Sequence, residues 1–368
     1  MRGGKYFTKV YSVPESWRKK ANTPLRQILG NFTWINSYNN CLYTILIVQQ
    51  RIMTQKIKKK ENERIGGSKS FKDNEIPDMR FMEKDNWILS KIFEKDMPED
   101  LEEANSRAQK IISGGSYRNF KPENKASEAQ MIAYDSFGAK GAKRLELAKK
   151  ALEIYPNCAD AYVSLAEMER GKKQRLELYR KGVDAGRADL GEEYFRENMG
   201  HFYGLIETRP FMRAYYGYGN TLWDLGNFEE ALKIYREMIK LNPQDNQGVR
   251  YSIITISIKE KKYDDALEIM SQYGDEPSAE MRYNSALLLL KKQGLSFDSK
   301  KALREAFDEN KYVPAIIIEA VKPAKNVGYI TIGGIDEATA YIEGNLENWM
   351  DDNRLLKWML EEFIRYMG

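Results

Sequence analysis

A repeated spacing in the second half of the chain limits its fold more than any other sequence feature. Four similar tetrads place an alanine at the same position and recur every 35 or 36 residues. They are Glu229–Leu232, Asp264–Leu267, Lys300–Leu303 and Asp336–Thr339. A period just above ~34 residues, with a small residue at the helix contact, is typical of stacked helical hairpins. Because one hairpin cannot bury its own apolar face, neighbouring hairpins must stack to form a core. The spacing therefore predicts an all-α fold.

The segment 212–245 carries the clearest hairpin pattern. Gly219 allows close approach of a neighbouring helix, and Gly226–Phe228 forms the turn between the two helices. Ala231 and the tyrosine four residues later pack the second helix, which ends before Pro243. These positions resemble the tetratricopeptide repeat (TPR) consensus at its tight turn, small pair, aromatic residue and terminal proline.

The neighbouring repeats are less regular. The turn at Lys261–Tyr263 lacks its glycine, and the turn after Gly294 has about three extra residues. Lys143–Pro156 has the pattern of a second helix, and Ala159–Gly171 that of the first helix of the next hairpin. An excess of residues around Gly182–Pro210 then breaks the period.

Three segments resemble a family of bacterial TPR proteins, which is related in turn to the eukaryotic suppression-of-tumorigenicity family. They are Ala148–Tyr162, Gly200–Arg213 and Leu241–Tyr251. Further on, Asn310–Pro314 followed by Asp336–Tyr341 is similar to the eukaryotic family as well. The resemblance covers about 125–360. It implies a helical repeat fold and protein interaction, and it supplies no catalytic residue.

We therefore predict a TPR-like right-handed α-solenoid of stacked helical hairpins over 125–366. Its first helix is expected to open at Ser127–Gln130, which has a capping-like pattern. Residues 61–124 are expected to hold a polar linker and a helical N-terminal cap, the cap at 81–112. Residues 1–60 read as a basic, poorly structured N-terminal arm.

The charge of the chain is divided unevenly between this arm and the rest. Residues 1–60 contain 12 Lys/Arg and one acid, Glu15, whereas the remaining residues contain 46 Lys/Arg and 53 Asp/Glu. An acidic body argues against a nucleic-acid-binding fold. Two hypotheses stay open for the arm. In one, it binds nucleic acid or an anionic membrane, with a steep salt dependence. In the other, translation starts at Met53 and the basic character belongs to a misassigned start.

Rare residue types exclude several kinds of site. Two cysteines, Cys41 and Cys158, cannot form a disulfide framework and favour a reducing compartment. One histidine, His201, cannot build a multi-histidine metal site. No phosphate-binding loop or serine-nucleophile motif is complete, and the longest apolar run is eight residues where a membrane span needs ~20. We expect a cytoplasmic, non-enzymatic protein without metal, cofactor or transmembrane segment.

The first candidate site is the inner groove of the solenoid, which the first helix of each TPR lines. Counting Met212 as the first repeat position gives the groove residues. They are Arg213, Tyr216, Asn220, Trp223 and Asp224 in one repeat and Tyr251 and Thr255 in the next, or Arg250 if the register slips by one. Asn220 suits an extended peptide backbone, and Arg213 or Arg250 suits a carboxylate. Alternatively, Tyr216 and Trp223 only pack between repeats. The predicted partner is a peptide or protein of unknown identity.

The segment Gly200–Pro210 is the alternative site. It combines the only histidine with a tyrosine, an acid, a threonine and an arginine, which are residue types that bind anions or act in acid–base chemistry. In this hypothesis His201 and Arg209 form the anion site of a small-molecule-binding regulatory domain. The competing interpretation is structural, with both side chains bonded to helix ends so that they hold an irregular connection in place.

Overall fold

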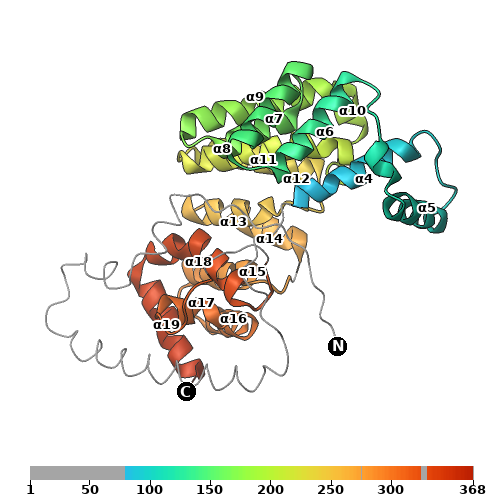
Figure 1. Cartoon of the computed structure of the whole chain (residues 1–368). Coiled ribbons are helices and arrows are strands. Elements are labelled where there is room, and N and C mark those ends of the chain that lie inside the picture. Colours follow the sequence, from blue (N-terminus) through green and yellow to red (C-terminus); the bar gives the residue numbers. More distant parts are fainter. Residues whose placement is uncertain (1–78, 275, 325–329, 368) are drawn as a thin grey trace. The chain divides into compact units, whose positions relative to one another are not determined.

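The computed structural model describes residues 79–274, 276–324 and 330–367. They form two compact units divided between Asn246 and Gln247, here called the N-terminal unit and the C-terminal unit. Helices build both units (Figure 1), and within the described residues there is no strand, only one isolated bridge. The predicted all-α fold of helical hairpins is confirmed.

Several sequence-based predictions lie outside the described residues. These are the basic arm at 1–60, the alternative start at Met53 and most of the linker that follows. The division into an arm, a linker with cap and a repeat domain over 125–366 therefore stays a prediction.

The N-terminal unit begins with two helices and continues as three hairpins (Figure 1). The first elements are α4 (Met79–Phe93), α5 (Leu101–Ser113) and the short 3-10 helix η1 (Ser116–Asn119). The hairpins are α6 (Lys125–Gly138) with α7 (Gly141–Ile154), α8 (Ala159–Met168) with α9 (Lys172–Leu190), and α11 (Arg209–Asp224) with α12 (Phe228–Leu241). The extra residues that break the period form the long α9, then α10 (Glu192–Glu197) and η2 (Ile206–Thr208).

The predicted start of the first hairpin was wrong by one helical turn. Asn124 is the N-cap of α6, with extended backbone and a side chain that accepts a hydrogen bond from the Ser127 amide. Ser127 is thus the third residue of the helix. An asparagine oxygen at this position satisfies one of the amides that have no partner inside the helix.

Two glycines let α11 lie close to the helices on both sides. A Cβ atom on Gly219 would lie 2.8 Å from the Tyr235 ring of α12, and one on Gly217 would lie 2.1 Å from the Tyr179 ring of α9. Real Cβ atoms essentially never approach so closely. The close approach predicted at Gly219 is confirmed, and Gly217 plays the same part towards the preceding hairpin.

The C-terminal unit contains two hairpins followed by three helices. The hairpins are α13 (Val249–Lys259) with α14 (Tyr263–Tyr273) and α15 (Ala279–Gln293) with α16 (Phe297–Glu309). The last helices are α17 (Tyr312–Ile317), α18 (Ile335–Met350) and α19 (Asn353–Met367). Each of the four tetrads lies in the first turns of a helix, and the alanines at 231, 266 and 338 are fully buried.

The turns of two successive hairpins place different residues at the position with left-handed backbone. Before α12 the turn residue Gly226 has φ +82°, and before α14 Lys261 has φ +59°. A lysine therefore adopts the left-handed conformation that glycine adopts in the repeat before it. This explains how the hairpin forms although its turn lacks a glycine.

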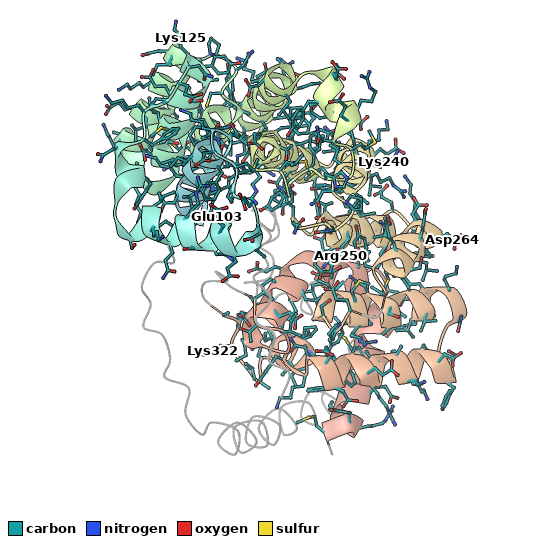
Figure 2. The ribbon with its side chains drawn as sticks, turned by 90° about the vertical axis from the view of Figure 1, so that its right-hand side faces the viewer. Glu103, Lys125, Lys240, Arg250, Asp264 and Lys322 are labelled. Carbon is teal, nitrogen blue, oxygen red and sulfur yellow. The ribbon has the colours of Figure 1, made fainter. Side chains whose placement is uncertain are left out.

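Charged side chains cover the outer surfaces of both units (Figure 2). Lys125 and Lys240 are exposed in the N-terminal unit, and Asp264 is exposed in the C-terminal unit. Solvated charges of this kind contribute little to stability and do not mark a site by themselves.

Candidate functional site

Helix α4 packs against the first helices of all three hairpins in its unit, α6, α8 and α11. We call the surface that these three helices form the first-helix face. Arg80 donates to the Glu167 carboxylate of α8 at 2.6 and 2.9 Å, and Lys84 donates to Asp135 of α6 at 2.6 Å. Trp87 belongs to a buried apolar cluster that also contains side chains of α6, α8, α9 and α11. These α4 residues are three or four positions apart, so one side of α4 makes all the contacts.

A buried ionic cluster joins α4 to α8 and α11. Nε and Nη2 of Arg213 donate to the two carboxylate oxygens of Asp160 at 2.7 and 2.5 Å, and Nη1 donates to Glu83 at 2.8 Å. The Arg213 side chain is 4% exposed and that of Asp160 is fully buried. On the other Glu83 oxygen, Arg209 donates at 3.1 Å, and Tyr134 donates to the oxygen that Arg213 binds.

The charges of this cluster compensate one another. Burial alone would raise the pKa of Glu83, but Arg213 and Arg209 hold it below its usual value. Burial would lower the pKa of Arg213, and the carboxylates of Asp160 and Glu83 raise it instead. Glu83 and Arg213 therefore stay ionised in the folded chain.

Arg213 lies in a buried ionic cluster and not, as the groove prediction assumed, on a surface open to a ligand. The sequence predicts a bidentate contact between Arg213 and a ligand carboxylate. In the structure the bidentate partner is Asp160 of the same chain, and all three guanidinium nitrogens donate to carboxylates. We therefore leave Arg213 out of the binding surface proposed below. One signal could have identified Asp160, a charged residue between two alanines in a first helix.

The other predicted groove residues of α11 lie along the rest of that helix. Tyr216 and Asn220 are half-buried, and Asn220 accepts a hydrogen bond from Tyr235 of α12 at 2.6 Å. Trp223 is 7% exposed, which fits the alternative in which it packs inside the unit. The backbone carbonyl of Asp224 accepts a hydrogen bond from Lys172 of α9.

The predicted groove residues of the next repeat belong to the C-terminal unit. Arg250 pairs with Glu276 at 2.9 Å and donates to the hydroxyl of Tyr251, which itself donates to Glu276. The Arg250 guanidinium also lies over the Tyr251 ring, 4.2 Å from its centroid. Thr255 is buried, and its hydroxyl donates to Asn345 of α18.

Helix α18 packs on α13 and α15 through amides and one carboxylate. Asn345 and Asn284 donate to the same oxygen of Glu280 at 2.9 and 3.2 Å, and Asn348 donates to the Thr255 carbonyl at 3.0 Å. No lysine or arginine among the described residues forms an ion pair with Glu280. Burial raises its pKa to about 8, despite the lowering effect of the two amides.

Within the segment Gly200–Pro210, the side chain of Arg209 is bonded to the backbone of the same segment. Nε of Arg209 donates to the Tyr203 carbonyl at 2.9 Å, and its guanidinium lies 5.2 Å from the Tyr203 ring centroid. Tyr203 has φ +70°, and its amide donates to the Thr208 hydroxyl at 2.8 Å. His201 is exposed. These contacts are those of the structural interpretation, and the anion site at His201 and Arg209 stays a hypothesis.

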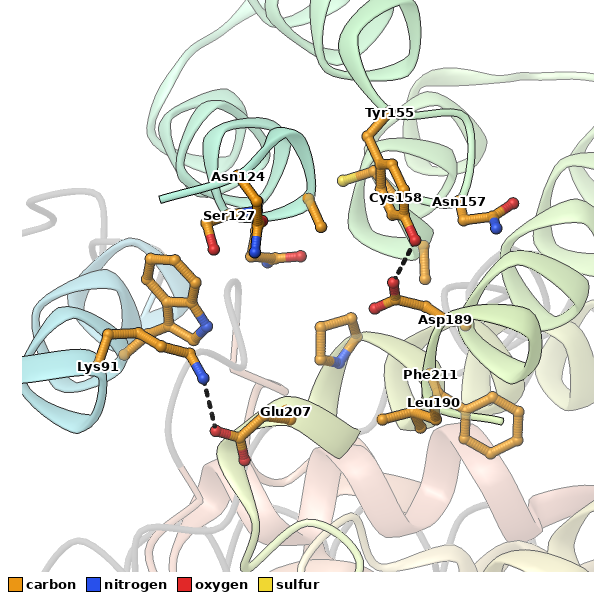
Figure 3. A pocket seen from close by; sticks show the side chains of 16 residues that line it. Lys91, Asn124, Ser127, Tyr155, Asn157, Cys158, Asp189, Leu190, Glu207 and Phe211 are labelled. Carbon is orange, nitrogen blue, oxygen red and sulfur yellow. Dashed lines mark hydrogen bonds and ion pairs between the residues drawn. The ribbon is translucent and has the colours of Figure 1, made fainter. Parts of the chain in front are cut away.

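A pocket of about 160 Å³ opens beside this segment in the N-terminal unit (Figure 3). Its lining comes from α4, the start of α6, the turn before α8, the end of α9 and the start of α11. Glu207 is on one side with Lys91, and Asp189 is on the other with Tyr155 (Figure 3). Neither His201 nor Arg209 lines it. Sequence reasoning missed this pocket because only the fold brings its five segments together.

Two kinds of site find no support in the described ranges. No three His, Cys, Asp or Glu side chains there are arranged to hold a metal ion. Cys158 is buried, and burial raises the pKa of its thiol to about 12, so it is not a reactive thiolate. In the same ranges, no helix combines the length and the apolar character that crossing a bilayer requires.

Comparison with known families and relatives supports the repeat assignment. Residues 212–245 match the tetratricopeptide repeat. A Protein ST7 homolog of Drosophila melanogaster is 24% identical over 231 residues, which cover 56% of this chain and 43% of that protein. A human Suppressor of tumorigenicity 7 protein-like is 26% identical over 237 residues, covering 56% and 40%. The resemblance to TPR proteins and to this eukaryotic family is thus confirmed. The chain spans about two fifths of the length of these relatives.

Two solved structures are also similar. YrrB, described as a TPR protein with an unusual peptide-binding site, has 18% identity and a TM-score of 0.34, over 60% of this chain and 91% of that chain. Yeast Tom70 has 17% identity and a TM-score of 0.35, over 91% and 66%. TM-scores this low do not define how the repeats of this chain are arranged.

Proposed function

We propose that the chain is a non-enzymatic scaffold that binds a segment of a partner protein along the first helices of its hairpins. One observation carries this proposal, the seating of α4 on the first-helix face. A helix that docks into a groove uses anchor residues three or four positions apart. On α4 these anchors are Arg80, the adjacent Glu83 and Lys84, and Trp87. The repeats thus present a surface that takes a helix by matched charges and an aromatic anchor.

The part of this surface proposed for the partner is the stripe of α11 that contains Tyr216 and Asn220. These residues are four positions apart and both are half-buried. A phenol and an amide suit an extended or helical backbone, because each can donate and accept hydrogen bonds. Arg250 and Tyr251 form the corresponding proposed contact in the C-terminal unit.

Site-specific photo-crosslinking tests the proposal. p-Benzoylphenylalanine replaces Tyr216 in the full chain, and in a matched control it replaces Lys233 of α12, whose side chain is 74% exposed. We expect one partner segment to be captured from position 216 and not from position 233, with peptide mass spectrometry identifying the segment. Equal capture from both positions, or none from 216, would contradict binding on the first helices.

A further inference from the structure

The pocket beside Gly200–Pro210 has walls of two chemical kinds. Its apolar lining includes Trp87, Leu190 and Phe211. Trp87 is 5% exposed and Phe211 only 1%, so Phe211 offers almost no free surface. The polar residues Asn124 and Asn157 also line it (Figure 3). An apolar body with a few placed polar groups is typical of a ligand pocket.

The charged residues that line the pocket differ in whether they have a partner of opposite charge. Lys91 is matched, because it donates to Glu207 at 3.5 Å and to Glu94. Asp189 accepts a hydrogen bond from the Tyr155 hydroxyl at 2.6 Å, and no lysine or arginine of the described residues lies within ion-pair distance of it. Asp189 is exposed to solvent, so water solvates its carboxylate and no cation of the described residues compensates it.

We propose that this pocket binds a guanidinium or ammonium group carried on an apolar stem. The stem lies against Trp87 and Leu190, and the cationic head pairs with the Asp189 carboxylate. An anion is disfavoured here, because the carboxylates of Asp189 and Glu207 would repel it. The lysine of the pocket, Lys91, is already paired with Glu207 and Glu94. An aromatic wall adds to the preference, since a ring face attracts cations.

The same chemistry has two sources, a free small cation and an arginine or lysine of a protein. A ligand of roughly ten non-hydrogen atoms binds in the millimolar range at ordinary efficiency. A peptide can gain further contacts from its backbone to polar lining residues such as Asn124. The two sources are therefore separated by comparing a free guanidinium compound with a short peptide.

The experiment is an NMR titration of the full chain, observed at the Trp87 indole, which Trp87→Phe assigns. The probes are agmatine, the peptide acetyl-Gly-Arg-Gly-amide and its neutral citrulline analogue. We expect the two guanidinium probes to shift the indole signal saturably, and the citrulline peptide to leave it unchanged. Tighter binding of the arginine peptide indicates a protein side chain, and equal or tighter binding of agmatine indicates a free cation.

Two charge-neutralising variants of the same helix make the test specific. Asp189→Asn keeps the acceptor for Tyr155 but removes the charge, and we expect at least tenfold weaker binding. Asp184→Asn, whose carboxylate pairs with Arg180 on the surface of α9, should change nothing. Equal binding of the citrulline peptide, full affinity in Asp189→Asn or no saturable shift would each overturn the proposal. The probes are defined compounds, so the result does not depend on the partner proposed above.

Discussion

The two units cover their first helices with different chemistry. In the N-terminal unit, α4 brings Glu83 to two arginines, which hold its pKa below the usual value. In the C-terminal unit, α18 surrounds Glu280 with amides, and burial raises its pKa to about 8. One architecture thus buries one carboxylate as a paired anion and another with hydrogen bonds alone. The neighbouring side chains decide the charge state, since both carboxylates are removed from water.

The largest expected effect comes from breaking the ionic cluster. Arg213→Ala leaves the carboxylates of Asp160 and Glu83 buried without their main cation. Removing one partner of a buried pair costs about 3–5 kcal/mol, and we expect this loss in the free energy of unfolding of the N-terminal unit. Urea denaturation with hydrogen exchange of α8 measures it. A loss similar to that of Arg180→Ala, a surface variant on α9, would show that the cluster does not hold α4 in place.

The second prediction is that the two units respond to pH in opposite directions. The pKa of Glu280 is raised, so this carboxyl group stabilises the folded unit fully below about pH 4.5. That stabilisation is lost as the pH rises through about 8. The pKa of Glu83 is lowered, so this carboxylate stabilises the folded unit above about pH 4.5. That stabilisation is lost as the pH falls through the lowered pKa. Between pH 6 and pH 9 we expect the C-terminal unit to lose about 1–3 kcal/mol of stability.

Hydrogen exchange of α15 and α8 at several pH values reads the two units separately. Glu280→Gln should remove the loss at high pH without changing the acid response of α8. If the variant keeps the alkaline loss in α15, another group is responsible and the contrast between the two carboxylates does not hold.

The smallest predicted effect concerns the two turns. Lys261 has the left-handed backbone that Gly226 has in the preceding hairpin. Lys261→Gly should therefore stabilise the C-terminal unit by about 0.5–1 kcal/mol, because a non-glycine residue is strained in this conformation. Gly226→Lys should destabilise the N-terminal unit by a similar amount. Chemical denaturation of both variants checks the pair, and a destabilised Lys261→Gly would contradict the strain argument.

Local patterns predicted much of the fold, because they depend on residues close in sequence. The tetrads predicted repeated helical hairpins, and Gly219 and Gly226 marked a close approach and a turn that the structure contains. The cap of α6 was misplaced, since Asn124 and Ser127 both suit a helix start and only the backbone distinguishes them.

Contacts distant in sequence were not predictable in the same way. Arg213 was recognised as a carboxylate-binding residue, but its partners lie 53 and 130 residues away. No pattern in one sequence connects Glu83 with α11, because α4 has no repeat register of its own. Of the candidate sites predicted from the sequence, only the segment Gly200–Pro210 contributes to the pocket, through Glu207 and Pro210.

The distance between Glu83 and Arg213 has a consequence for synthesis of the chain. A ribosome adding about 5–20 residues per second needs roughly 6–26 s to make the 130 residues between them. Glu83 is without Arg213 for all of that time, and Asp160 of α8 is without it for the last 53 residues. The ionic cluster of the N-terminal unit therefore forms only after the start of α11 has left the ribosome.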